Sequence, residues 1–176
     1  MNTDNSFQPT NPALASDESF ERLWDLIKDC RFGMLVSSDT EGAMHGRPMT
    51  TVQKHFGGTL WFLAPTDSEV VSDIEFNDNV CVTYAQTNAG DFVSVTGTGS
   101  VLTDTAIKEK LWSPIIQAWF PQGPASKSVA VIKVDAQQAD FWDSKSNKLV
   151  QLFSMASAYL KGTTPKNIGE HRHLNM

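Results

Sequence analysis

The sequence predicts an α+β fold, in which an antiparallel barrel or strongly curved sheet carries helices over its ends. About six strand-like runs follow one another, most of them joined by short turns. Helical patterns interrupt the strands in only two places. The length of 176 residues is typical of one domain and is sufficient to bury most of its apolar surface without metals or disulfides.

The chain is expected to begin with a flexible arm, because residues 1–16 are rich in Asn, Pro, Ser and Thr and show no periodicity. A helix is predicted to start at Ser16, since two acidic residues follow where the helix dipole favours them. Its apolar residues recur at helical spacing and predict one docking side: Phe20, Leu23, Trp24 and Ile27.

The expected strands are short apolar runs bounded by turn-forming residues, and they cover 32–38, 43–56, 59–64, 80–86, 92–104 and 129–143. Pro48 cannot donate a hydrogen bond to a neighbouring strand. It therefore predicts that 43–56 is an edge strand or contains a bulge. The G-x-G at 97–99 continues into strand-like residues, which predicts a bend or a close backbone approach and not a dinucleotide turn.

Helical patterns are predicted at 68–77, 104–112, 113–120 and 148–162. The folded domain is expected to span 17–161, followed by a C-terminal tail at 162–176 that is not tied to the domain.

Composition excludes several classes of partner. The net charge is −6 and the pI about 5.1, without a cluster of basic residues, so we expect no nucleic acid. No signal-like N-terminus and no run of 18 apolar residues is present, so we expect a soluble, cytoplasmic protein without a membrane segment. Cys30 and Cys81 are expected to be buried, and neither they nor the EHRH sequence at 170–173 predicts a metal site.

A candidate binding hairpin follows from strand parity. Arg47 and Met49 have the same parity, and Pro48 between them leaves nearby backbone groups free for a ligand. Trp61 and Phe62 point to opposite faces of the next strand, so at most one of the two rings lines a site. The alternative interpretation is that Arg47 only pairs with a surface carboxylate.

The start of the helix at 68–77 is a candidate anion site. Thr66, Asp67 and Ser68 lie where free N–H groups and the helix dipole favour a negative charge.

Several segments occur in a characteristic order: HGRPMT, GGTLWFLAPTDS, NDNVCVTYA, FVSVTGTGSV, LWSPIIQAWFP and ADFWDSKSNKLVQLFSMA. Together they resemble the general stress protein 26 group of the pyridoxamine 5′-phosphate oxidase-like flavoproteins. The resemblance covers 17–161. It implies a split β-barrel homodimer that binds FMN, sometimes FAD, at the dimer interface.

The resemblance also implies cofactor-binding residues, and one position departs from the family pattern. Relatives usually carry a Lys where this chain has Val70, which removes a positive charge from the phosphate site. The matching positions are Arg47, Pro48, Met49 and Thr50 along the flavin and its phosphate, Trp61 and Phe62 under the ring, Thr66 and Ser68 at the phosphate, and Trp112, Trp119 and Phe120 on helices of the neighbouring protomer.

Three functions are compatible with these patterns. The first is a flavin-dependent oxidoreductase of low specificity, since a bound flavin carries the redox chemistry. The second is a non-catalytic flavin-binding stress protein, since no acid, base or nucleophile is evident beside the expected ring site. The third is a split barrel without flavin that acts through protein contacts, or a haem-binding variant with His45 as ligand. Pyridoxamine phosphate oxidation itself is not expected, because the basic residues for a second phosphate are missing.

Overall fold

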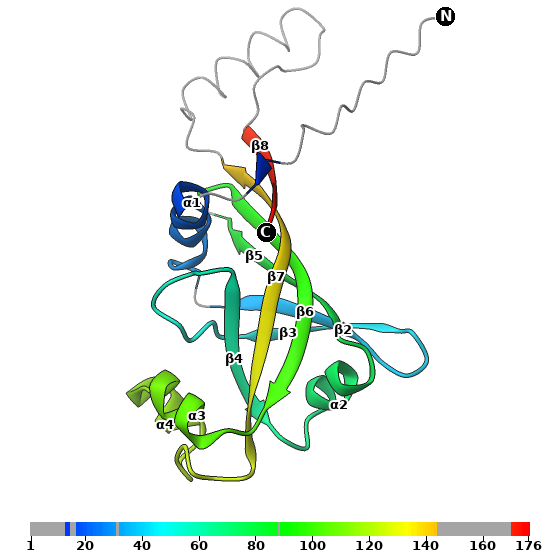
Figure 1. The fold of residues 1–176 in the computed structure, drawn as a ribbon, viewed down its shortest axis with the longest axis vertical. Helices are drawn as coiled ribbons and strands as arrows, with labels where there is room; N and C mark the ends of the chain where they lie inside the picture. Colours follow the sequence, from blue (N-terminus) through cyan, green and yellow to red (C-terminus); the bar gives the residue numbers. More distant parts are fainter. Residues whose placement is uncertain (1–12, 15–16, 31, 88, 144–169) are drawn as a thin grey trace, which may run out of the picture.

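The computed structural model describes residues 13–14, 17–30, 32–87, 89–143 and 170–176. One sheet has the strand order β1-β8-β7-β6-β5-β2-β3, with β4 paired to β7 (Figure 1). The sheet curves but does not close, so the predicted α+β split barrel is confirmed. The elements are β1 (Ala13–Leu14), α1 (Asp17–Ile27), β2 (Gly33–Ser38), β3 (Met44–Met49), β4 (Thr59–Pro65), α2 (Glu69–Phe76), β5 (Asn79–Gln86), β6 (Asp91–Leu102), α3 (Thr105–Leu111), α4 (Pro114–Trp119), β7 (Val129–Asp143) and β8 (Glu170–Asn175).

Strand β7 organises the sheet because it is longer than its partners. One edge of β7 pairs with β6, and the other pairs first with β4 and then, from Gln138 onward, with β8. A bulge lies between Thr96 and Gly97 of β6. A Cβ atom at Gly97 would lie 2.1 Å from the carbonyl oxygen of Asp135, so only glycine permits this close approach of β6 and β7.

The barrel is open between β3 and β4. Strand β3 ends at Met49, and the backbone N–H of Val52 then donates to the carbonyl of Trp61 at 3.0 Å. The Gln53 amide donates to the Thr59 carbonyl at 2.8 Å and accepts from the Trp61 N–H at 3.0 Å. The prediction of one strand over 43–56 is therefore wrong, because the chain leaves β2 after Met49 to reach β4. Pro48 does lie on an edge strand, as predicted.

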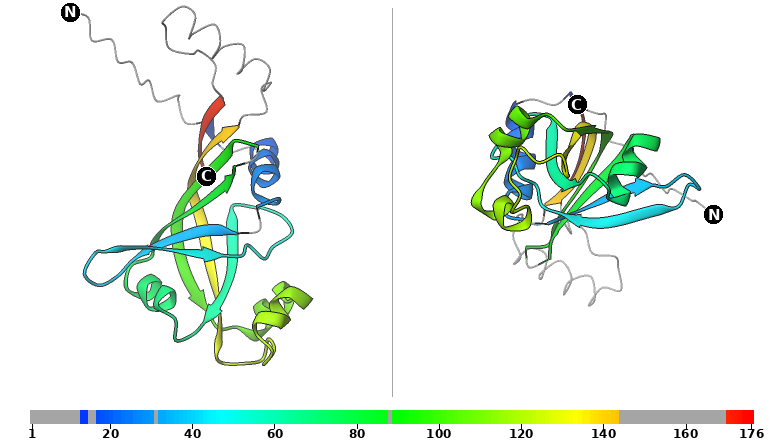
Figure 2. Two further views of the ribbon diagram at one scale, coloured as in Figure 1. Left: turned by 180° about the vertical axis from the view of Figure 1, so that it is seen from behind. Right: turned by 90° about the horizontal axis from the view of Figure 1, so that it is seen from below.

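Two hydrophobic clusters form the core. The larger fills the barrel and receives the apolar sides of α1 and α2, including Leu23, Ile27 and Val70. The smaller lies between the β4–β7 pair and the helices α3 and α4. Both views in Figure 2 agree with Figure 1 in placing α1, α3 and α4 on one side of the molecule and α2 on the other. Within the described part of the chain, no helix combines the length and apolarity needed to cross a membrane.

Helices α3 and α4 begin at capped positions. The Asp104 carboxylate accepts from the Ile107 N–H, and the Ser113 hydroxyl accepts from the Ile116 N–H. The buried ammonium of Lys108 donates to the carbonyl of Ser126 at 2.6 Å, which ties α3 to the segment before β7.

Both ends of the chain contribute strands that the sequence does not predict. Strand β8 is antiparallel to β7 and parallel to β1, so 170–175 is not an untethered tail and 1–16 is not wholly an arm. The physical reason is that β7 extends past β4 and leaves an edge that β8 covers. The helix expected at 148–162 lies outside the described residues.

Candidate functional site

An apolar cavity of about 160 Å³ lies between the end of β3 and helix α4. It brings together five of the predicted cofactor-binding residues, which come from segments far apart in the sequence: Pro48, Met49, Thr50, Trp119 and Phe120. Trp119 and Phe120, which the resemblance assigned to the neighbouring protomer, line this cavity in the same protomer as Pro48 and Met49. Phe32 and Ile115 also line it and are 59% and 62% exposed, so apolar surface faces solvent here. A concave apolar site with few polar groups suits a planar aromatic ligand.

A second cavity of about 350 Å³ adjoins the first and shares Phe32, Thr50, Ile115 and Trp119 with it. Helix α1 supplies Trp24 to this second cavity. One wall is held by the Thr51 hydroxyl, which lies 2.6 Å from the hydroxyl of Tyr84. Burial raises the pKa of Tyr84, so its phenol stays neutral and available for this hydrogen bond.

The remaining aromatic candidates lie behind the first cavity or in the core. Phe62 is 0% exposed inside the barrel. The prediction that it contacts a flavin ring is therefore wrong, because the Phe62 side chain fills the core. Trp61 points to the opposite side, as predicted, and, like Trp112, packs against the smaller cluster. Trp112 lies 6.4 Å from Phe120 between ring centroids, so it supports a cavity residue from behind.

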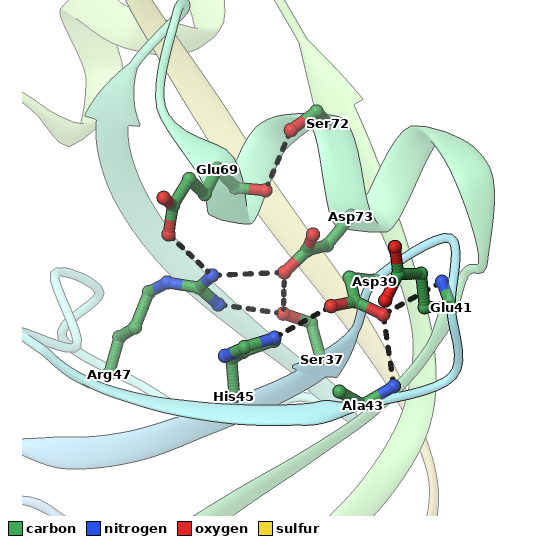
Figure 3. Close-up of polar contacts among 9 residues, drawn as sticks. All are labelled: Ser37, Asp39, Glu41, Ala43, His45, Arg47, Glu69, Ser72 and Asp73. Carbon is green, nitrogen blue, oxygen red and sulfur yellow. Dashed lines mark hydrogen bonds and ion pairs between the residues drawn. The ribbon is translucent and has the colours of Figure 1, made fainter.

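Arg47 lies in a cluster with one hydroxyl and two carboxylates (Figure 3). Its Nη1 donates to Ser37 Oγ at 3.0 Å, and the Ser37 hydroxyl donates to Asp73 Oδ2 at 2.8 Å. Arg47 Nη2 lies 3.1 Å from Asp73 Oδ2 and 3.2 Å from Glu69 Oε2. The alternative interpretation of Arg47, as the partner of a surface carboxylate, therefore describes part of its environment, and its contact with a phosphate stays a prediction.

The turn of the β2–β3 hairpin lies beside this cluster. The Asp39 carboxylate accepts from the N–H groups of Glu41 and Ala43, both at 2.9 Å, and lies 2.9 Å from the ring Nε2 of His45 (Figure 3). The hydrogen bond with His45, and after it that with Ala43, lowers the pKa of Asp39 below its usual range. The ring Nε2 of His45 is therefore engaged by a carboxylate, and its role as a haem ligand stays a prediction.

The start of α2 differs from the expected anion site. The Thr66 N–H donates to the Ser128 carbonyl, and both the N–H and the hydroxyl of Ser68 donate to the Pro65 carbonyl. Three of the donors expected to face a phosphate are thus engaged within the chain. Val70 is 3% exposed and its side chain belongs to the core. This position therefore adds no positive charge at the start of α2, where relatives usually carry a lysine.

Some residues of the site were not found from the sequence. Asp73 shares the buried face of α2 with Val70, Val71 and Ile74, and a carboxylate on an apolar helix face is a signal of a buried partner. Gln53 offers no such signal. Within the described residues, no group of three His, Cys, Asp or Glu side chains lies close enough together to hold a metal ion. Cys30 and Cys81 are half-buried free thiols and not fully buried as expected.

The open barrel and the cavity beside its edge strand place this chain in the split-barrel class of α+β proteins. The chain belongs to the pyridoxamine 5′-phosphate oxidase-like family, whose sequence profile matches residues 18–166. It is 25% identical to protein bli-3 of Neurospora crassa over 169 residues, or 90% of this chain and 80% of that protein.

Two solved structures have the same fold. The general stress FMN/FAD binding protein of Xanthomonas citri is 28% identical, with a TM-score of 0.64 over 76% of this chain and 94% of that one. A Clostridium acetobutylicum protein related to general stress protein 26 of Bacillus subtilis has a TM-score of 0.69 at 14% identity, over 92% of this chain and 97% of that one. The family expected from the sequence is thereby confirmed.

Proposed function

We propose that this protein binds a flavin, FMN or FAD, with the isoalloxazine ring in the cavity between β3 and α4. The observation that carries the proposal is the meeting of five predicted cofactor residues in that one cavity. The walls fit a flat heterocycle, because Met49, Trp119 and Phe120 offer apolar and aromatic surface and Thr50 offers a hydroxyl. Membership of the family and the flavin named for the Xanthomonas citri relative support the same ligand.

We also propose that the protein acts as a homodimer. Met34, Met44 and Phe92 are 41%, 64% and 44% exposed. Strand pairing puts Met34 opposite Pro48 and Met44 opposite Ser38, on one face of the sheet. Met34 also pairs with Thr83 of β5, and Ala85, two residues further along β5, pairs with Phe92, so Phe92 lies on the same face. An exposed apolar sheet face of this kind is typical of an interface between copies of a chain.

The proposed activity is that of a flavin-dependent oxidoreductase of low specificity. A bound flavin supplies the electron transfer, and the chain positions the ring and excludes water from one side of it. Trp112 and Trp61 pack behind the cavity and so stiffen the wall that carries Phe120.

A second candidate function is that of a split barrel that binds no flavin or holds it without turnover. The observation that favours it is the engagement of Arg47 by Asp73 and Glu69, which leaves less positive charge for a phosphate.

The absorbance spectrum of the purified protein, with and without added FMN, separates these functions. We expect the two visible flavin bands and bleaching by dithionite. Trp119→Ala should weaken FMN binding by about tenfold, because one stacking wall is lost. Phe76→Ala is the matched control, since both rings are largely exposed, at 73% and 62%, and Phe76 lies on α2, away from the cavity. Colourless protein that takes up no added FMN contradicts the proposal.

Turnover of NADH or NADPH with an electron acceptor then separates enzyme from storage protein. The oxidoreductase proposal expects a rate above that of free FMN at the same concentration. A rate equal to that of free FMN, with flavin bound, supports the non-catalytic alternative.

A further inference from the structure

The two carboxylates on Arg47 differ sharply in their surroundings. Asp73 has a side chain only 8% exposed and also accepts the hydroxyl of Ser37, which is fully buried. Glu69 has a side chain 86% exposed, and its contact with Arg47 Nη2 is 3.2 Å long. Asp73 is therefore the fixed partner of the guanidinium, whereas Glu69 is an exposed partner that approaches it from another side than Asp73 and Ser37 (Figure 3).

An exposed ion pair is easily exchanged. Contacts between solvent-exposed charges are weak, because water and salt screen them and both side chains lose freedom when they pair. A phosphate offers the same guanidinium more acceptor oxygens and more charge than one carboxylate does. A phosphate that approaches Arg47 thus meets Glu69 first, as a competitor of the same sign.

We propose that Glu69 is a specificity-determining residue that competes with the ligand's phosphate for Arg47. This inference rests on the proposed flavin site and on the predicted contact of Arg47 with the phosphate, since Arg47 precedes the cavity residues Pro48 and Met49 on β3. The cluster sets one guanidinium against two carboxylates. FMN must displace Glu69 and tolerate its charge nearby, whereas riboflavin, which lacks the phosphate, binds the ring cavity without this cost. Glu69 therefore lowers the ratio of the affinity for FMN to the affinity for riboflavin.

Glu69→Gln tests the inference more cleanly than a change at Arg47, because Arg47 also holds the buried Asp73. FMN and riboflavin are titrated into wild-type protein and Glu69→Gln at low salt, with binding followed by flavin fluorescence. FMN should bind roughly tenfold more tightly to the variant, and riboflavin should change less than about twofold. Glu75→Gln is the matched control, since Glu75 is also exposed on α2 and its replacement changes the net charge equally.

The inference is overturned if Glu69→Gln leaves the ratio of FMN to riboflavin affinity unchanged, or if Glu75→Gln changes that ratio as much. Both results leave the proposed flavin site intact, provided that either flavin binds.

A second measurement needs no flavin. Inorganic phosphate is titrated into protein with ¹⁵N-labelled arginine, and the Arg47 side-chain resonance is followed by NMR. Glu69→Gln should lower the phosphate concentration at half-shift several-fold relative to wild type and to Glu75→Gln. If the phosphate concentration at half-shift is the same in all three proteins, the proposal that Glu69 competes with phosphate is wrong. If the resonance shifts as expected while no flavin binds, Glu69 competes for phosphate and the flavin proposal alone fails.

Discussion

Asp73 of α2 and Arg47 of β3 form an ion pair, with Oδ2 3.1 Å from Nη2, and the same carboxylate oxygen accepts the hydroxyl of buried Ser37. This contact joins a helix to the β2–β3 hairpin, between residues 26 positions apart in the sequence (73 − 47). Because the Asp73 side chain is 8% exposed and that of Arg47 21%, water replaces the lost contacts poorly.

Asp73→Ala should lower the free energy of unfolding by about 2–3 kcal/mol, because the Ser37 hydroxyl loses its acceptor and the Arg47 guanidinium keeps only the exposed carboxylate of Glu69 as an ionic partner. Urea denaturation followed by circular dichroism measures this change. Asp67→Asn is the control, since Asp67 is exposed just before α2, and it should change stability by less than about 0.5 kcal/mol. Equal effects of the two variants would show that the pair contributes little.

Gln53 takes the place of a neighbouring strand for part of β4. Gln53→Leu should remove both side-chain hydrogen bonds and leave the Trp61 N–H without its acceptor. We expect a loss of about 1–3 kcal/mol and much faster amide exchange at Trp61. Hydrogen exchange by NMR measures the second effect. The amide of Phe62 is the internal reference, because strand alternation turns it toward β7 and away from Gln53. Unchanged protection of Trp61 would mean that the β4 edge is closed in another way.

Tyr84 links the core to the segment that follows β3. Tyr84→Phe should cost about 1 kcal/mol, because the Thr51 hydroxyl loses its partner while the ring, which packs against Gly33, remains. Gly33 has no room for a side chain here, since a Cβ would lie 2.7 Å from the Tyr84 ring.

The pH dependence of Tyr84 has a defined sign. Burial raises its pKa in the folded protein, so folding favours the protonated phenol. Its contribution is fully present below the unfolded pKa of about 10 and is lost as the pH rises above it. Stability should therefore fall more steeply above pH 10 in wild type than in Tyr84→Phe, as measured by urea denaturation at several pH values. Parallel curves would contradict a buried phenol.

Local sequence patterns predicted most of the fold. Apolar periodicity placed α1, α2, α3 and α4, and the lack of an N–H at Pro48 identified the edge strand. The last strand was predicted at 129–143, with the bounds that the structure gives to β7. These features depend on neighbouring residues, so the sequence carries them directly.

Features that depend on distant residues were missed. The end of β3 at Met49 is decided by the Gln53 bridge to β4, and the strand at 170–175 by the free edge of β7. At the site, the sequence named Arg47 but not the Asp73 that holds it, because their contact arises only when α2 packs on the hairpin. Phe62 was assigned to the ligand, although strand alternation showed only that one of Trp61 and Phe62 faces the core and not which one.

The exposed sheet face makes the dimer prediction testable. Met34 lies on β2 opposite Pro48, outside the core, and is 41% exposed, so Met34→Glu should leave the protomer folded. If this face is the interface, each protomer buries an unpaired carboxylate there, and the dimer should weaken by at least about 2 kcal/mol, or roughly thirtyfold in Kd. Sedimentation equilibrium at micromolar concentration measures the change. Phe76→Glu, which places the same charge on an exposed aromatic position of α2, should leave the dimer intact. A wild-type monomer, or a Met34→Glu dimer as tight as wild type, would rule out this face as the interface.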